Sequence, residues 1–333
     1  MGAHTLKAGA DVMLCPVTIE YHRLANGLFT FNAQSAPGAS AGAPQLTAVQ
    51  AYGLGLASMY TQQFGNPISA ADKTAVGVFL QDAWRVSPRL TLDLGVRYDI
   101  EFTDSLKPGS PAMQTVFDRL SLRRSPPLDK NNIQPRVGVA YQVLADGKLT
   151  VRGSYGVFYD RLLNLAMYGA AAGDGVQIAR VTIPGAAASA VFQSPAQKFS
   201  EFPSSGGSTG LTAFSSNWRL GNSQHGDLAL SSQIRPGLTL DAAYIWVKGT
   251  HLARSRDYNP TDSLRAAAFL AAGNSSAALL GQNYFRSDTA VSDTMTMEGS
   301  ASSIYNGLRL GVRGQINPAL TVNASYTFAK SDR

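Results

Sequence analysis

The feature that most constrains the fold is a pattern that occurs four times along the chain. Each copy has a short turn sequence, then Leu-Thr-Leu or Leu-Thr-Val, then alternation of apolar and polar residues; the copies begin at Ser87, Asp146, Arg235 and Asn317. Pro, Gly, Asn and Asp supply the backbone angles of tight turns. Another alternating segment precedes each copy, so the repeated unit is predicted to be a β-hairpin with a short turn.

Alternation within the predicted strands separates an apolar face from a polar one. Between residues 90 and 99, Leu92 and Val96 have one parity, whereas Asp93 and Arg97 have the other. A period of two is that of a β-sheet with one apolar and one polar face. We expect about ten strands, at residues 4–14, 24–32, 74–86, 89–101, 132–144, 148–160, 223–234, 238–249, 303–314 and 319–329.

Two further segments do not follow the alternation. Residues 45–63 have mixed spacing and are expected to form a short helix or a loop excursion. The tract from Pro203 to Thr212 is rich in Ser and Gly and is expected to be a mobile loop.

Two architectures have one apolar and one polar face: a soluble sandwich, which buries the apolar face, and an outer-membrane barrel, which turns that face to lipid. The predicted strands have about ten residues, the length of a tilted membrane-spanning strand. The connections between strands differ greatly in length: the turns are tight, whereas the spans 102–131, 160–222 and 250–302 are very long. We therefore predict an all-β, antiparallel transmembrane β-barrel, open or incomplete, with meandering strands and long extracellular loops.

Aromatic residues near the strand ends agree with a membrane interface. They are Trp84, Tyr98, Tyr141, Tyr155, Tyr159, Tyr244, Trp246, Tyr326 and Phe328. The alternative explanation is that aromatic residues simply have high β-propensity.

Composition argues against several other classes of function. Charged residues make up 15% of the chain, below the roughly 25% of a typical soluble protein. The net charge of +6 is spread without a Lys/Arg run, so no nucleic-acid partner is expected. Cys15 and four scattered histidines offer no disulfide framework or metal-ligand spacing. No Walker or HExxH sequence occurs, and we expect no enzymatic activity, catalytic residue, cofactor or metal.

The polar face carries the candidate functional residues. If the apolar face meets lipid, the polar side chains face an aqueous lumen, and an Arg on the lipid side would cost roughly 2–4 kcal/mol at mid-bilayer. The lumen-facing candidates are Gln81, Arg85, Asp93, Arg97, Asp99, Gln134, Arg136 and Arg152. They either contact a plug or line the path of a substrate, or they only solvate the lumen and pair across strands. Asp82 has apolar parity, which a bulge or a place at the interface would accommodate.

Several strings follow one another along the chain: His4–Asp11, Phe79–Val86, Leu90–Tyr98, Gln134–Tyr141, Val151–Asp160, Tyr305–Leu308 and Ala324–Phe328. In this succession they resemble the barrel of TonB-dependent outer-membrane receptors, of the Oar-like branch. The resemblance implies the outer membrane of a Gram-negative-type bacterium, with membrane lipid as a partner. It also implies part of the wall of a gated uptake channel, with a plug domain and the TonB complex as partners of the full-length protein.

The chain departs from the family in its extent. Family barrels have about 22 strands, and neither a plug domain nor a signal peptide is evident here. Residues 1–333 are therefore expected to be one partial barrel domain and the chain a fragment, with an unknown substrate. Two alternatives stay open: a passive porin or adhesin-like outer-membrane barrel, and a soluble all-β binding protein.

Overall fold

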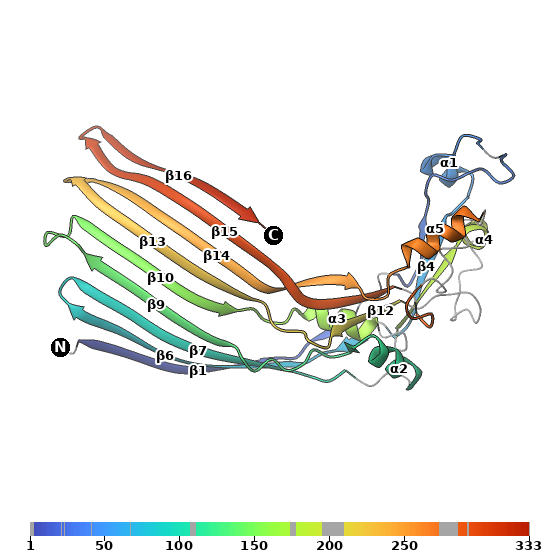
Figure 1. Ribbon diagram of the computed structural model, residues 1–333, viewed down its shortest axis with the longest axis horizontal. Helices are drawn as coiled ribbons and strands as arrows, with labels where there is room; N and C mark the ends of the chain where they lie inside the picture. The colour runs from blue at the N-terminus through green and yellow to red at the C-terminus, as the bar shows by residue number, and fades with distance from the viewer. Residues whose placement is uncertain are drawn as a thin grey trace.

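A computed structural model of the chain describes residues 3–20, 22, 24–40, 42–66, 68–106, 111–173, 178–194, 210–272, 286–291 and 293–332. Most of the residues in its strands belong to one open, curved sheet whose long antiparallel strands follow one another along the chain (Figure 1). In pairing order the long strands are β1 (His4–Cys15), β6 (Lys73–Ser87), β7 (Leu90–Thr103), β9 (Ile133–Gln142), β10 (Leu149–Tyr159), β13 (Asn222–Arg235), β14 (Leu238–Asp257), β15 (Thr294–Asn317) and β16 (Leu320–Asp332). Within the described residues β1 and β16 do not pair with each other, so the sheet is not closed.

Tight turns join four hairpins at one end of the sheet (Figure 1). In the turn between β6 and β7, the Ser87 hydroxyl accepts hydrogen bonds from the main-chain N–H groups of Arg89 and Leu90, at 3.3 and 3.1 Å. Gly147 and Gly237, in two other turns, have φ angles of 71° and 79°, which glycine adopts at little cost. These turns lie where the repeated pattern predicts them.

Nine of the ten predicted strands are confirmed as strands of the main sheet. The prediction of a wall strand at 24–32 is wrong. Only Leu28–Thr30 forms a strand, β3, and it belongs to a separate three-stranded sheet with β4 (Met59–Gly65) and β11 (Ile178–Pro184). Its aromatic residue Phe29 packs against Tyr60, with ring centroids 4.5 Å apart. Local alternation predicts a strand, but not the sheet that the strand joins.

Four long connections join the strands at the other end of the sheet, at residues 16–72, 104–132, 160–221 and 258–293, here called the first to fourth connections. Apart from the strand expected at 24–32 and the short helix or loop excursion expected at 45–63, the sequence predicts only loops here. The described parts of these connections contain helices and short strands. Besides β3, β4 and β11, these are β2 (Thr18–Glu20), α1 (Ala48–Gly53), β5 (Ile68–Ala70), α2 (Pro111–Arg119), β8 (Leu122–Arg123), α3 (Asn164–Ala172), α4 (Gly185–Gln193), β12 (Leu211–Ser215) and α5 (Ser263–Ala271).

Of the two possibilities expected for residues 45–63, a short helix or a loop excursion, the structure has a short helix, α1, at Ala48–Gly53. Thr47 and Gln50 form a capping box at its N-terminus, in which each side chain accepts a hydrogen bond from the main-chain N–H of the other residue. The rest of that segment includes β4. Of the tract predicted as a mobile loop, residues 203–209 lie outside the described residues, and Leu211 and Thr212 belong to β12.

Strands β14 and β15 extend past the predicted limits of 249 and 303, to Asp257 and Thr294. Their pairing shifts register between Gly249 and Ala253, around His251, which has a φ angle of 53°. This irregularity interrupts the alternation, so the pattern predicts strand ends that are too early. The outer part of β15 also pairs with β12 in parallel, and β12 pairs with β8.

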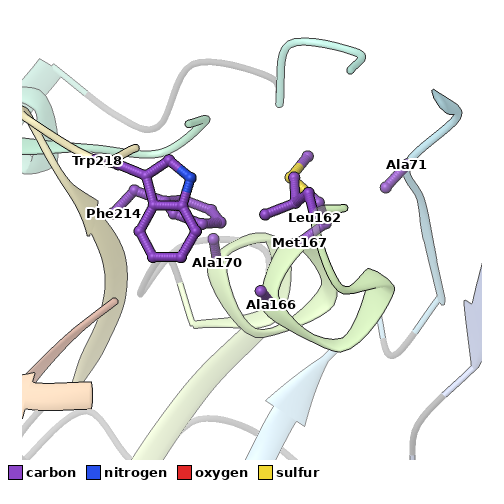
Figure 2. Close-up of a cluster of buried hydrophobic side chains, with 7 residues drawn as sticks. All are labelled: Ala71, Leu162, Ala166, Met167, Ala170, Phe214 and Trp218. Atoms are coloured by element: carbon purple, nitrogen blue, oxygen red, sulfur yellow. The ribbon is translucent and has the colours of Figure 1, made fainter. Parts of the chain in front are cut away.

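Buried apolar side chains gather in the connections. Figure 2 shows one such cluster, in which Trp218 and Phe214 lie beside Met167 and Ala170 of α3. The rings of Phe214 and Trp218 meet edge to face, with centroids 5.3 Å apart. A second cluster joins Phe117 of α2 to residues of the third and fourth connections. The described wall strands contribute little to this core, because most of their apolar side chains are exposed or half-buried.

Candidate functional site: the polar face of the sheet

One face of the sheet is apolar and open. In antiparallel pairs, residues opposite one another project from the same face, and Leu80 lies opposite Val96 while Leu94 lies opposite Val137. Exposed apolar side chains on this face include Leu6, Val12, Val78, Leu80, Leu94, Val96, Val137, Val139, Leu228, Leu230, Leu308, Leu310 and Phe328. An exposed apolar surface that spans so many strands is typical of contact with another apolar phase.

The opposite face carries all eight residues that the sequence predicts for a lumen. Arg97 lies opposite Gln134, and Asp93 opposite Gly138. The eight are Gln81 and Arg85 on β6, Asp93, Arg97 and Asp99 on β7, Gln134 and Arg136 on β9, and Arg152 on β10. The strand registers thus place these side chains on one surface across four strands.

Arg97 is the centre of a charged network on this face. Its guanidinium donates to both carboxylate oxygens of Asp99, at 2.6 and 2.8 Å, and to Asp11 Oδ1 at 2.8 Å. The amide of Gln134 also donates to Asp99. Arg97 therefore links β1, β7 and β9 by charge-assisted hydrogen bonds, which are stronger than neutral ones.

A groove of about 700 Å³ follows the polar face beside this network. Four of the predicted residues line it: Gln81, Asp93, Arg97 and Arg136. Arg136 lies over the ring of Phe158, with its guanidinium carbon 4.7 Å from the ring centroid. This is a cation–π contact, which leaves the edge of the guanidinium free to donate.

Other predicted residues lie outside the groove. Asp99 is hydrogen-bonded to the groove residue Arg97, and Gln134 is hydrogen-bonded to Asp99. Arg85 and Arg152 lie closer to the tight turns. The groove also contains residues that the sequence reasoning did not select: Ser154, Phe158, His225 and Asp227. The sequence could have pointed to them, because their positions in the predicted strands 148–160 and 223–234 place them on the same face as Arg152. Their distance from Arg136 depends on strand register, which the sequence does not show.

Asp82 lies on the apolar face, opposite Leu6 and Leu94, as its parity predicts. The register irregularity of β6 comes later, between Arg85 and Ser87, so a bulge does not explain Asp82. Instead, Asp82 Oδ2 is 2.7 Å from Nδ1 of His4, whose ring stacks on Trp84 at 5.1 Å. The hydrogen-bonded partner makes a carboxylate less costly on an apolar surface.

A second ionic cluster lies on the outer parts of β14 and β15, past the residues that pair with β16. Glu298 is 4% exposed and accepts hydrogen bonds from Arg254 at 2.6 Å, Tyr258 at 2.7 Å and Ser300 at 2.7 Å. Burial raises the pKa of Glu298, but the hydrogen bonds from Tyr258, Ser300 and Arg254 and the charge of Arg256 outweigh it and lower the pKa to about 2. Glu298 is therefore ionised at neutral pH, and its hydrogen bond with Tyr258 ties the start of the fourth connection to the wall.

Among the described residues, no group of three or more His, Cys, Asp or Glu side chains could hold a metal ion. None of the described helices is both long and apolar enough to cross a membrane. The polar face instead offers mixed charge, amides and hydroxyls, which suit reversible contact with a polar surface or solute.

An antiparallel meander with an open apolar face, a charged opposite face, tight turns at one end and long connections at the other is the wall of a membrane β-barrel. The chain belongs to the outer membrane beta barrel domain family, whose sequence profile matches residues 1–332. The predicted location in the bacterial outer membrane is confirmed.

One relative supports the predicted resemblance to Oar-like receptors. The TonB-dependent transporter Oar of Myxococcus xanthus is 29% identical over 168 residues, which are 50% of this chain and 14% of that protein. The similar region is only a small part of Oar. The comparison therefore supports a resemblance in protein family and does not establish the activity of this chain.

Solved structures show the same fold at low sequence identity. The outer-membrane transporter YddB of Escherichia coli has a TM-score of 0.54 at 12% identity, over 99% of this chain and 31% of that chain. A double mutant of the ferric enterobactin receptor PfeA of Pseudomonas aeruginosa has a TM-score of 0.51 at 12% identity, over 98% of this chain and 33% of that chain.

Proposed function

We propose that this chain forms part of the barrel wall of an outer-membrane TonB-dependent transporter. The observation that carries the proposal is the separation of faces: Arg97, Arg136 and Arg152 share one face with the other polar candidates, and the exposed leucines and valines share the other. Turning the arginines to lipid would cost roughly 2–4 kcal/mol each at mid-bilayer. The polar face therefore lines the interior, and the apolar face contacts lipid.

The length of the apolar face agrees with a membrane. On β14 the apolar-face positions run from Leu240 to Trp246, and the next such position is Lys248. Leu238 has the same parity and begins the strand, so the apolar-face stretch spans nine residues. At about 3.3 Å each and a tilt of about 40°, it covers about 23 Å, close to the height of about 25 Å of the apolar band of such barrels. The Tyr244 hydroxyl on this face donates to Asn306 at 2.6 Å, so its polar atom is satisfied.

The interior groove is the surface that a plug domain or a passing substrate would contact. Gln81, Asp93 and Arg136 line it without an ion pair to another described residue, so they keep donors and acceptors for a partner. The names of the relatives include transporters and receptors, which favours this role over a passive porin. The long connections would form the extracellular surface that first meets a ligand.

Adjacent positions on β15 test the orientation of the sheet. Leu310→Cys and Arg309→Cys, each in a Cys15→Ser background, are labelled with a small fluorophore after reconstitution into lipid vesicles. Brominated lipids should quench the fluorescence of the label at position 310, which faces lipid. Aqueous iodide should quench the fluorescence of the label at position 309, which faces the interior. Equal quenching of both labels, or the reverse preference, would overturn the proposal.

A further inference from the structure

Two lysines lie on the apolar face of the sheet, toward the end with the long connections. Lys248 on β14 follows Trp246 by two residues, and Lys330 on β16 follows Phe328 by two, so each shares the face of that aromatic residue. Both lysines are exposed. A lysine on the lipid side is costly at the middle of a bilayer and is tolerated near its surface. The two lysines therefore mark the level at which this face meets lipid headgroups.

Lys248 keeps its charge available for a ligand. Among the described residues, no hydrogen bond or ion pair engages its side chain. Lys330 differs, because its Nζ is 3.0 Å from Oδ2 of Asp332. The charge of Lys330 is thus balanced, and Lys248 is the uncompensated cation of this part of the surface.

Two amide side chains lie beside these lysines. Gln224 on β13 is directly opposite Lys248, and Asn306 on β15 is directly opposite Lys330. Lys248 is also opposite Ile304, two residues from Asn306, and such diagonal neighbours are within reach of long side chains. Strand register therefore gathers Gln224, Lys248, Asn306 and Lys330 on four adjacent strands, and we call this group the outer polar cluster.

Tyrosine hydroxyls fix the direction of both amides. Tyr155 donates to Oε1 of Gln224 at 3.0 Å, and Tyr244 donates to Oδ1 of Asn306 at 2.6 Å, both at the exposed surface. The amide oxygens are thereby occupied, whereas neither amide nitrogen has a hydrogen-bond partner among the described residues. Each NH₂ group has two donors. The outer polar cluster therefore presents free donors beside an uncompensated positive charge.

We propose that the outer polar cluster binds the phosphate group of a membrane lipid. A phosphate has negative charge and several acceptor oxygens, which match an ammonium group and amide donors. The acyl chains of such a lipid would lie along Leu308 and Phe328, exposed apolar residues that pair with each other nearer the middle of the strands. This inference rests on the proposed orientation of the sheet, because the cluster meets lipid only if the apolar face does.

Brominated lipids measure the preference of this surface for a phosphate headgroup. Leu308→Cys, in a Cys15→Ser background, carries a fluorophore beside the cluster, and the full chain is reconstituted into phosphatidylcholine vesicles. Brominated phosphatidic acid, whose headgroup is a phosphate alone, should bind next to this label about fivefold more tightly than brominated phosphatidylcholine and quench it accordingly. A label at Val12→Cys, on the apolar face of the edge strand β1, should show no preference.

Variants separate the cluster from the overall charge of the chain. Lys248→Gln should remove most of the fivefold preference at position 308. Lys148→Gln is the matched control, because it removes the same charge from a lysine that is 51% exposed beside a tight turn, at the other end of the sheet; it should leave the preference unchanged. Asn306→Leu keeps the charge and suits the apolar face, and it should reduce the preference by about twofold.

The outcomes distinguish this proposal from the orientation on which it rests. Equal quenching of the label at position 308 by the two lipids would overturn the phosphate site and leave the orientation intact. If neither lipid quenches this label, the face does not meet hydrocarbon and both proposals fail. An unchanged preference in Lys248→Gln, or an equal loss in Lys148→Gln, would also contradict a site formed by the cluster.

Discussion

The guanidinium of Arg97 on β7 donates to the carboxylate of Asp11 on β1 at 2.8 Å, although β6 lies between these two strands. Gly77 on β6 leaves the space for this contact. A methyl group on Gly77 would lie 2.1 Å from Nη2 of Arg97 and 2.5 Å from Asp99. Because Gly77 has no side chain, the edge strand β1 is attached by the ion pair between Arg97 and Asp11 as well as by its main-chain hydrogen bonds to β6.

Gly77→Ala should displace Arg97 and break its contact with Asp11. We expect a loss of about 1 kcal/mol in unfolding free energy, because the pair is partly exposed. Urea titration of the chain in micelles measures it. Gly95→Ala is the control on the same face, since its added methyl would lie 3.6 Å from the nearest atom, an ordinary contact. Equal losses in the two variants would show that Gly77 has no special role.

Removing the side chain of His4 should lower the stability of the chain, because Asp82 would lose its hydrogen-bond partner. His4→Ala leaves the carboxylate on the apolar face with no partner, and we expect it to destabilise the chain in lipid vesicles by about 1–3 kcal/mol. The double variant His4→Ala/Asp82→Leu should recover this loss, since leucine suits the face. Unfolding in urea from vesicles gives both values. If the double variant is no more stable than His4→Ala alone, the pairing does not explain Asp82.

Glu298→Gln should weaken the attachment of the fourth connection. At pH 7 we expect a loss of about 2 kcal/mol, typical of hydrogen bonds to a charged group. The pKa of Glu298 in the fold is about 2, below the ordinary value of 4.5. Its stabilising contribution is therefore complete above about pH 4.5 and lost as the pH falls toward 2.

The pH dependence of stability separates Glu298 from other carboxylates. The difference between the unaltered chain and Glu298→Gln should shrink below pH 4.5 and vanish near pH 2. Glu20→Gln, at a side chain that is 61% exposed, should show no such profile. A Glu298→Gln difference that stays constant from pH 7 to pH 2 would contradict the ionic explanation.

Phe214→Ala should loosen more than one connection. Phe214 is fully buried, and its strand β12 lies between β15 and β8. We expect a cost of about 3–5 kcal/mol for the packed outer region, with faster hydrogen exchange in β8 and in residues 293–300 as well as in β12. Leu264→Ala is the control, because Leu264 is 82% exposed on α5. Faster exchange confined to β12 would show that the connections pack independently.

Sequence reasoning succeeded where the structure is local. The turn at Gly237 and the alternation around Leu92 and Arg97 depend on residues that are close in the chain, so hairpins and faces were predictable. It failed for residues 24–32, because β3 has strand-like alternation but pairs with β4 rather than with the wall. It also ended β14 too early, because the register shift near His251 conceals the continuing strand.

The sequence by itself determined the faces of the wall and its tight turns, because a period of two and a turn residue act over a few neighbouring positions. Only the tertiary structure decided that Arg97 meets Asp11, that His4 partners Asp82, and that β12 lies between β15 and β8. Those relationships join residues far apart in the chain, and strand register and side-chain packing, which no local pattern encodes, bring them together.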